Sequence, residues 1–137
     1  MDKEFVTFEI AKKLKEKGYP QVEKGTLAMY SENGEWYSLS PTLDDYHYDF
    51  RDFDLHDFVC PTISQVLKWF RKEYHLHFEP VAAAYGYNLI ISDTPDKGGT
   101  DRYFSHANDD GPNDGGAWDE YEDCILYGIE YTLDNLI

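Results

Sequence analysis

Apolar residues recur at helical spacing in three parts of the chain. Thr7 can cap a helix over residues 8–17, which Gly18 would end. The apolar positions of this helix form one broad side: Phe8, Ile10, Ala11 and Leu14. Pro61 has the fixed φ that suits a helix start, and an apolar stripe follows it: Ile63, Val66, Leu67, Phe70 and Tyr74. A third helix, over 118–136, has an apolar arc so broad that we expect central burial or a homodimer interface.

Alternation of apolar and polar residues predicts four strands in two hairpins: 27–32 with 35–39, and 75–81 with 85–92. Asn33 and Gly34 tolerate positive φ, so they predict a two-residue type I′ turn in the first hairpin. Pro80 has no backbone N–H to give to a neighbouring strand, which predicts an edge position in the second.

The predicted elements follow the order α, β, β, α, β, β, α. We therefore expect an α+β fold over a single domain, 1–137, in which three helices cover an antiparallel sheet made of two β-hairpins. Two segments lie outside these elements. Residues 40–58 interleave aromatic residues with Asp in no regular period and predict a long ordered loop. Residues 94–116 are rich in Gly, Asp and Asn, and they are too many for a routine connection.

Composition narrows the class of protein. Hydrophobic residues make up 42% of the 137 positions, which is enough to fold around one core. No apolar run reaches the roughly 18 residues that a membrane-spanning helix needs. Cys60 and Cys124 stand alone without C-x-x-C spacing, which suits reduced thiols, and we interpret both as small apolar residues. Together these features predict a soluble, cytoplasmic protein.

The net charge is −15, and it is concentrated in two blocks. Residues 30–60 contain eight Asp and Glu against Arg51, and residues 93–137 contain twelve against Lys97 and Arg102. Nucleic acids and anionic membranes would be repelled, so we expect direct binding to neither. A basic protein would be attracted.

The first acidic block contains a candidate for partner binding. Carboxylates and tyrosines alternate irregularly in it: Asp44, Asp45, Tyr46, Tyr48, Asp49, Asp52, Asp54 and Asp57. Such a loop could engage a host protein, or it could imitate the phosphate track of DNA and occupy a nucleic-acid-binding protein. A charge that only keeps the protein soluble is the plainer interpretation.

A second candidate site lies on the helix predicted after Pro61. Trp69 falls off the apolar stripe, and its neighbours are polar or cationic: Gln65, Lys68, Arg71 and Lys72. An aromatic ring among cations can stack on an anionic ligand, so this face predicts a binder or sponge for a nucleotide-like signal. Packing of Trp69 over a hairpin edge is the alternative.

A third candidate site is a metal site on the strand predicted over 75–81. His75 and His77 would project from one side of that strand, and Glu79 would continue it. Three such ligands could support a metal-dependent hydrolase, although an exposed strand face also needs polar residues.

A calcium loop over 108–122 fails the required spacing, because Pro112 takes a ligand position. Motifs for nucleotide cofactors or activated nucleophiles are missing, so no motif supports catalysis, and we expect no cofactor.

Three segments together resemble a group of short uncharacterised proteins encoded by phages and mobile elements of gut Bacteroidetes. The segments are VTFEIAKKLKEKG at 6–18, PTISQVLKWFR at 61–71 and YEDCILYGIEYTLDNLI at 121–137. The resemblance implies a biological setting rather than an activity. With the missing catalytic motifs, it leads us to expect a non-enzymatic binding protein that engages a host protein through acidic and aromatic loops.

Overall fold

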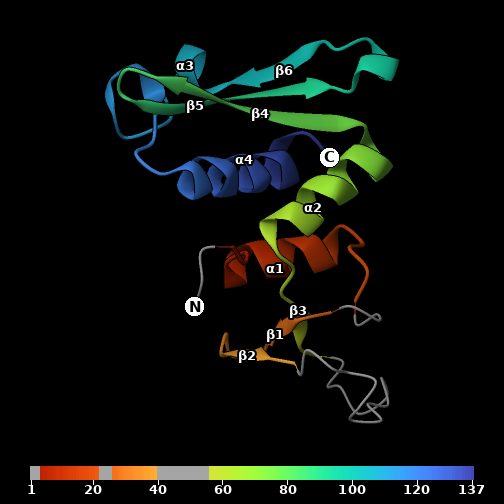
Figure 1. Ribbon diagram of the computed structural model, residues 1–137. Coiled ribbons are helices and arrows are strands. Elements are labelled where there is room, and N and C mark those ends of the chain that lie inside the picture. The colour runs from red at the N-terminus through yellow and green to blue at the C-terminus, as the bar shows by residue number, and fades with distance from the viewer. Residues whose placement is uncertain (1–3, 22–25, 40–55) are drawn as a thin grey trace. The chain divides into compact units, whose positions relative to one another are not determined.

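The computed structural model describes residues 4–21, 26–39 and 56–137. The chain divides into two compact units, Met1–Thr62 and Ile63–Ile137, and each is described here by itself. Figure 1 shows the elements of both. The single domain expected from the sequence stays a prediction. The class of the fold is confirmed as α+β, because helices and antiparallel sheets occur together.

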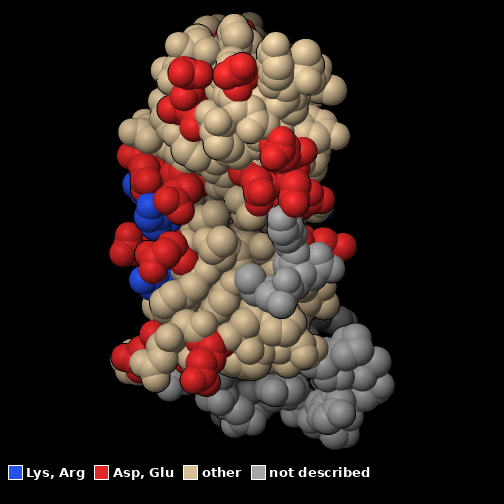
Figure 2. All heavy atoms as spheres, turned by 90° about the vertical axis from the view of Figure 1, so that its left-hand side faces the viewer, with Lys and Arg blue, Asp and Glu red and all other residues tan. Residues whose placement is uncertain are grey.

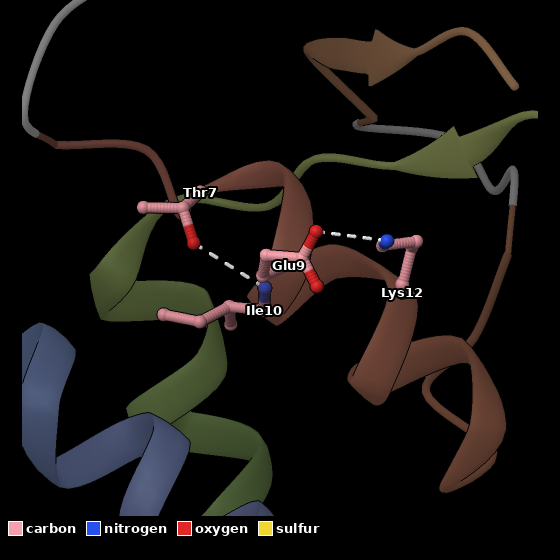
Figure 3. A network of polar contacts seen from close by, with 4 residues as sticks. All are labelled: Thr7, Glu9, Ile10 and Lys12. Atoms are coloured by element: carbon pink, nitrogen blue, oxygen red, sulfur yellow. Dashed lines mark hydrogen bonds and ion pairs between the residues drawn. The ribbon is translucent and has the colours of Figure 1, made fainter. Parts of the chain in front are cut away.

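The first unit contains helix α1 (Phe8–Glu16), which begins where the sequence predicts. The side chain of Thr7 accepts a hydrogen bond of 3.3 Å from the backbone N–H of Ile10, as a helix N-cap does. Beside this cap, Glu9 of the first turn forms an ion pair of 2.8 Å with Lys12 on the surface of the helix (Figure 3). The opposite side of α1 is buried through Ile10, Ala11 and Leu14.

A three-stranded antiparallel sheet completes the first unit. Its strands are β1 (Ala28–Tyr30), β2 (Trp36–Ser38) and β3 (Phe58–Val59), in the order β2-β1-β3. The ring of Phe8 on α1 packs against those of Tyr30 and Phe58, with centroids 5.5 and 5.7 Å apart. The hydroxyl of Tyr30 also donates to the carbonyl oxygen of Val6 at 2.7 Å. Aromatic contacts therefore bind helix and sheet together.

The hairpin between β1 and β2 forms as predicted, but its turn differs. Ser31 and Glu35 pair through a backbone hydrogen bond of 2.8 Å, and the N–H of Gly34 donates to the carbonyl oxygen of Ser31 at 2.9 Å. Gly34 has φ of 89°, whereas Asn33 is not among the residues with positive φ. A type I′ turn needs positive φ at both positions, so the connection is instead a three-residue loop that ends on a left-handed glycine.

The second unit contains the remaining elements. They are α2 (Ile63–Trp69), the π-helix η3 (Phe70–Tyr74), β4 (Leu76–Ala83), β5 (Gly86–Asp93), the 3-10 helix η4 (Pro95–Lys97), β6 (Asp101–Phe104), α3 (Ser105–Asn108), the 3-10 helix η5 (Asp114–Gly116) and α4 (Tyr121–Asn135). The strands form an antiparallel sheet in the order β4-β5-β6, so Pro80 does lie in an edge strand. Helix α4 runs along one face of this sheet (Figure 1).

Helix α4 approaches the sheet closely at Gly128. A Cβ at this position would lie 2.2 Å from Cδ2 of Leu89 and 3.0 Å from Cε2 of Phe78. The broad apolar arc of the helix is buried through Cys124, Ile125, Gly128, Ile129, Thr132 and Leu133. Central burial therefore accounts for the breadth of the arc, and a homodimer stays a prediction.

Two differences from the predicted architecture concern the strands. The hairpins belong to two separate sheets rather than one, and each sheet has a third strand that the sequence did not predict, β3 or β6. Both are short, with two and four residues, so no period-two alternation could reveal them. No helix in the part of the chain that the structure describes is long and apolar enough to cross a membrane.

A buried serine completes the hydrogen bonds of β5 beyond the end of β6. Ile90 pairs with Phe104, the last residue of β6, so the next N–H along β5, that of Leu89, has no residue of β6 opposite it. The hydroxyl of Ser105 accepts that N–H at 2.8 Å and donates to Oδ1 of Asn88 at 3.0 Å. Ser105 thus extends the ladder with its side chain.

Replacing Ser105 with alanine is expected to destabilise the protein by about 1–3 kcal/mol, because the N–H of Leu89 and the amide of Asn88 would stay buried without this partner. Urea denaturation measures the change. Ser64→Ala, at an exposed position of α2, is the matched control and should leave stability within about 0.5 kcal/mol. Equal stability of the two variants would contradict this role for Ser105.

Candidate functional site

The segment between α3 and α4, residues 109–119, is fixed to the sheet and is called the strap below. At its start the hydroxyl of Tyr103 donates to Oδ2 of Asp110 at 2.6 Å. In its middle Nδ1 of His106 donates to the carbonyl oxygen of Gly115 at 2.8 Å. The segment 94–116, which the sequence left without elements, contains η4, β6, α3 and η5, and specific contacts hold its last part to the sheet.

The end of the strap is held like an additional strand. Tyr87 of β5 donates its N–H to the carbonyl oxygen of Trp118 at 2.7 Å, and Trp118 donates back to Tyr87 at 3.0 Å. The ring of Trp118 is buried beside that of Tyr127, with centroids 5.0 Å apart. This pairing explains why α4 begins at Tyr121 and not at 118, where helical spacing placed its start.

A shallow groove of about 570 Å³ lies between the strap and the turn from β4 to β5. We call it the Tyr85 groove, and its lining consists of Ala84, Tyr85, Gly86, Pro112, Asn113, Asp114 and Asp119. The side-chain amide of Asn113 donates to the carbonyl oxygen of Tyr85 and to Oδ1 of Asp119, both at 2.7 Å. Asn113 thus fixes the strap to the turn and orients one carboxylate.

Aromatic and acidic side chains share the surface of the Tyr85 groove and its surroundings. Tyr85 is 62% exposed and Tyr121 is 44% exposed, so both rings are accessible to a partner. Tyr121 rests edge-on against Tyr87 at 5.8 Å between centroids, so its position is fixed although it is exposed. Asp114 and Asp119 are exposed carboxylates of the lining, which includes no Lys or Arg among the described residues. Exposed rings beside carboxylates suit a cationic ligand.

Most of the predicted acidic partner-binding loop lies outside the described residues: Asp44, Asp45, Tyr46, Tyr48, Asp49, Asp52 and Asp54. Asp57 is described, and its carboxylate is used inside the first unit. It accepts hydrogen bonds from the hydroxyl of Tyr37 at 2.6 Å and from the N–H of Glu32 at 3.2 Å. Asp57 therefore stabilises the first hairpin.

The predicted ligand face around Trp69 lies on α2 and η3. Tyr74 follows Trp69 by five residues, which is the hydrogen-bond spacing of the π-helix η3. The two rings meet edge-on, with centroids 5.2 Å apart. Trp69 is half-buried against Phe70 and Tyr74 of its own helical segment, and both the ligand face and the packing over a hairpin edge stay predictions. The other residues of the set, Gln65, Lys68, Arg71 and Lys72, are exposed around it.

The three predicted metal ligands do not share one strand face. His75 has φ of 56° and ends η3, so β4 begins only at Leu76. His77 and Glu79 both lie on the exposed face of β4. Among the described residues no group of three or more His, Cys, Asp and Glu side chains could hold a metal ion.

Both cysteines are free and buried. Burial raises the pKa of the Cys60 thiol to about 11 and that of the Cys124 thiol to about 12. Neither thiol is ionised at neutral pH, and a thiolate is the nucleophilic form. The two residues therefore serve as small apolar side chains of the core, in agreement with the interpretation from the sequence.

Carboxylates are distributed unevenly over the surface. On the face drawn in Figure 2, Asp and Glu side chains form several groups, some of which have Lys or Arg among them. The imitation of DNA by the acidic residues stays a prediction.

Sequence reasoning missed the Tyr85 groove because its lining comes from two segments about 28 residues apart, which meet through the hydrogen bond from Asn113 to Tyr85. One indication was present: the turn sequence AYGY places a tyrosine at the tip of a hairpin, where exposure is expected. Comparisons of the chain with protein-family models, with curated proteins and with solved structures found no significant match.

Proposed function

We propose that this protein is a non-enzymatic binding protein whose Tyr85 groove takes a basic segment of a partner protein. The observation that carries the proposal is the exposed ring of Tyr85 beside the carboxylates of Asp114 and Asp119 in a groove fixed by Asn113. An arginine or lysine side chain can stack on the ring and pair with the carboxylates at the same time.

The chemistry of the surface supports binding over catalysis. The groove is shallow, whereas an active site needs groups that surround a reacting atom. Its polar lining is acidic, and the pKa values of the buried thiols lie too high for a nucleophile at neutral pH. Tyrosine gives a large contact area at little entropic cost, which favours it at protein interfaces.

The charge of the chain supports a basic partner. A net charge of −15 attracts a positive surface over long range and raises the rate of association. Nucleic-acid-binding proteins belong to this class because their binding surfaces are rich in Lys and Arg. The resemblance of three segments to phage and mobile-element proteins supports a host protein as the partner.

Two groove variants test the proposal in quantitative pull-downs from a bacterial host lysate. Asp114→Asn with Asp119→Asn removes the carboxylates, and Tyr85→Ala removes the ring. We expect each to lower recovery of the partner at least about tenfold, because central aromatic and charged contacts dominate such interfaces. Added salt should weaken capture by the wild type as well.

The matched control is Asp96→Asn with Asp101→Asn. It changes the net charge by the same amount at exposed positions beyond the other end of β5 from Gly86. We expect recovery within about twofold of the wild type. Equal losses in the control and the groove variants would show that total charge, and not the Tyr85 groove, governs binding, and unchanged recovery with all variants would reject the groove.

A further inference from the structure

The backbone hydrogen bonds of β5 show which residues of β4 face outward. The N–H and carbonyl groups of Tyr87 both bond to Trp118, and the N–H of Leu89 bonds to Ser105. These groups of β5 therefore point away from β4. In an antiparallel pair, residues opposite such positions do not exchange hydrogen bonds, so their own backbone groups also point away from the partner strand.

The residues opposite these positions are Ala82, which faces Tyr87, and Pro80, which faces Leu89. Phe78 continues the same series. Their backbone groups point to the open side of β4, which is the edge strand of its sheet (Figure 1). We call Phe78, Pro80 and Ala82 the β4 edge. No strand that the structure describes in this unit pairs with it.

The end of β4 near the turn is accessible and apolar. Residues 81–85 are all exposed, with Val81 at 37%. Alanine side chains follow Val81 at positions 82–84, and their small size lets another backbone approach closely. Pro80 cannot donate, so the β4 edge offers three carbonyl acceptors and N–H donors only at Phe78 and Ala82.

We propose that an extended segment of the partner joins the β4 edge as a fourth strand, with basic and apolar residues in alternation. This inference rests on the proposed function and specifies how the partner binds. Apolar side chains of the added strand would lie beside Pro80 and Ala82, and basic ones would lie beside exposed Glu79 on the other face. Backbone hydrogen bonds supply affinity in this mode, and alternate side chains supply specificity.

Charge distinguishes this occupant from a second copy of the chain. The second unit contains fourteen Asp and Glu against five Lys and Arg, so two β4 edges side by side would bring like charges together. A basic strand reverses that repulsion. The partner is therefore expected to be a positively charged segment and not another copy.

The test uses the 137-residue chain and a synthetic ten-residue peptide in which Lys and Val alternate, with binding measured by fluorescence anisotropy. Ala82→Pro removes the outward N–H of residue 82, just as Pro80 already lacks an N–H two residues earlier. We expect it to weaken binding at least tenfold. Pro80→Ala restores a missing donor, and we expect it to strengthen binding about threefold or more. A peptide in which Glu replaces Lys should not bind.

The outcomes separate this inference from the proposed function. Normal peptide binding by both β4 edge variants, with weak binding by the Tyr85 groove variants, would overturn strand addition and leave the groove in place. Slower hydrogen exchange at the Ala82 amide in the peptide complex would support strand addition even if Ala82→Pro failed to fold. A doubled mass of Pro80→Ala in light scattering without peptide would assign the β4 edge to a second copy and overturn the proposal.

Discussion

Replacing Gly86 with alanine is expected to lower the free energy of unfolding by about 3 kcal/mol or more. Gly86 has φ of 129°, a backbone conformation that strains residues with a side chain. The added Cβ would also lie 2.2 Å from the carbonyl oxygen of Trp118. That oxygen accepts the hydrogen bond from Tyr87, so strap and β5 could not keep their pairing.

Gly98→Ala is the matched control for this effect. Gly98 also has positive φ, 104°, but a Cβ there would meet only the hydroxyl of Thr100 at 4.0 Å. Its cost is expected to be about 1–2 kcal/mol from backbone strain alone. Urea denaturation followed by circular dichroism measures both variants. Equal losses would show that the contact with Trp118 adds nothing. Because Gly86 lines the Tyr85 groove, its variant should also lose partner binding.

Stability is expected to fall steeply as the pH rises above about 9. Burial raises the pKa of the Cys60 thiol from 9.0 to about 11 and that of Cys124 from 9.0 to about 12. Burial also raises the pKa of the Tyr103 hydroxyl, and the hydrogen bond to Asp110 adds to this effect. The pKa of Tyr30 is raised as well, chiefly by burial.

The sign of the effect follows from which state holds the protons. Below pH 9 the folded and the unfolded protein both keep the thiol protons, and the stability that the two buried thiols contribute is fully present. Between pH 9 and the folded pKa, the unfolded chain releases protons that the folded protein keeps, so unfolding becomes easier. Each thiol then costs up to about 1.4 kcal/mol per pH unit, until about pH 11 for Cys60 and about pH 12 for Cys124. The tyrosines contribute above about pH 10.

Urea denaturation at pH 8, 9, 10 and 10.5 measures this dependence. Cys124→Ala removes one titrating group and should make the decline between pH 9 and 10.5 shallower, although it lowers stability at pH 8 because a small cavity forms. An identical decline in this variant and the wild type would show that Cys124 does not contribute. A stability that stays constant up to pH 10.5 would contradict the assignment for both thiols.

Local rules allowed several elements to be predicted correctly. The cap at Thr7, the stripe that begins at Ile63 and the edge position of Pro80 each depend on residues a few positions apart. Helical period, hydrogen bonding by a cap and the missing N–H of proline are properties of a short stretch of chain, so the sequence contains them directly. The α+β class followed from the order of these elements.

Only the tertiary structure decided the parts that depend on distant pairing. Strand β3 exists because Val59 meets Met29, and β6 exists because Tyr103 meets Ile91, yet neither short strand has a period of its own. The start of α4 is delayed because Trp118 bonds to Tyr87 instead of joining the helix. The Tyr85 groove and the β4 edge arise in the same way. The amino-acid sequence by itself determined the local elements and the acidic charge. Hydrogen bonds between residues far apart in the chain decided which side chains meet. The energy of such a hydrogen bond depends on a geometry that no short segment contains.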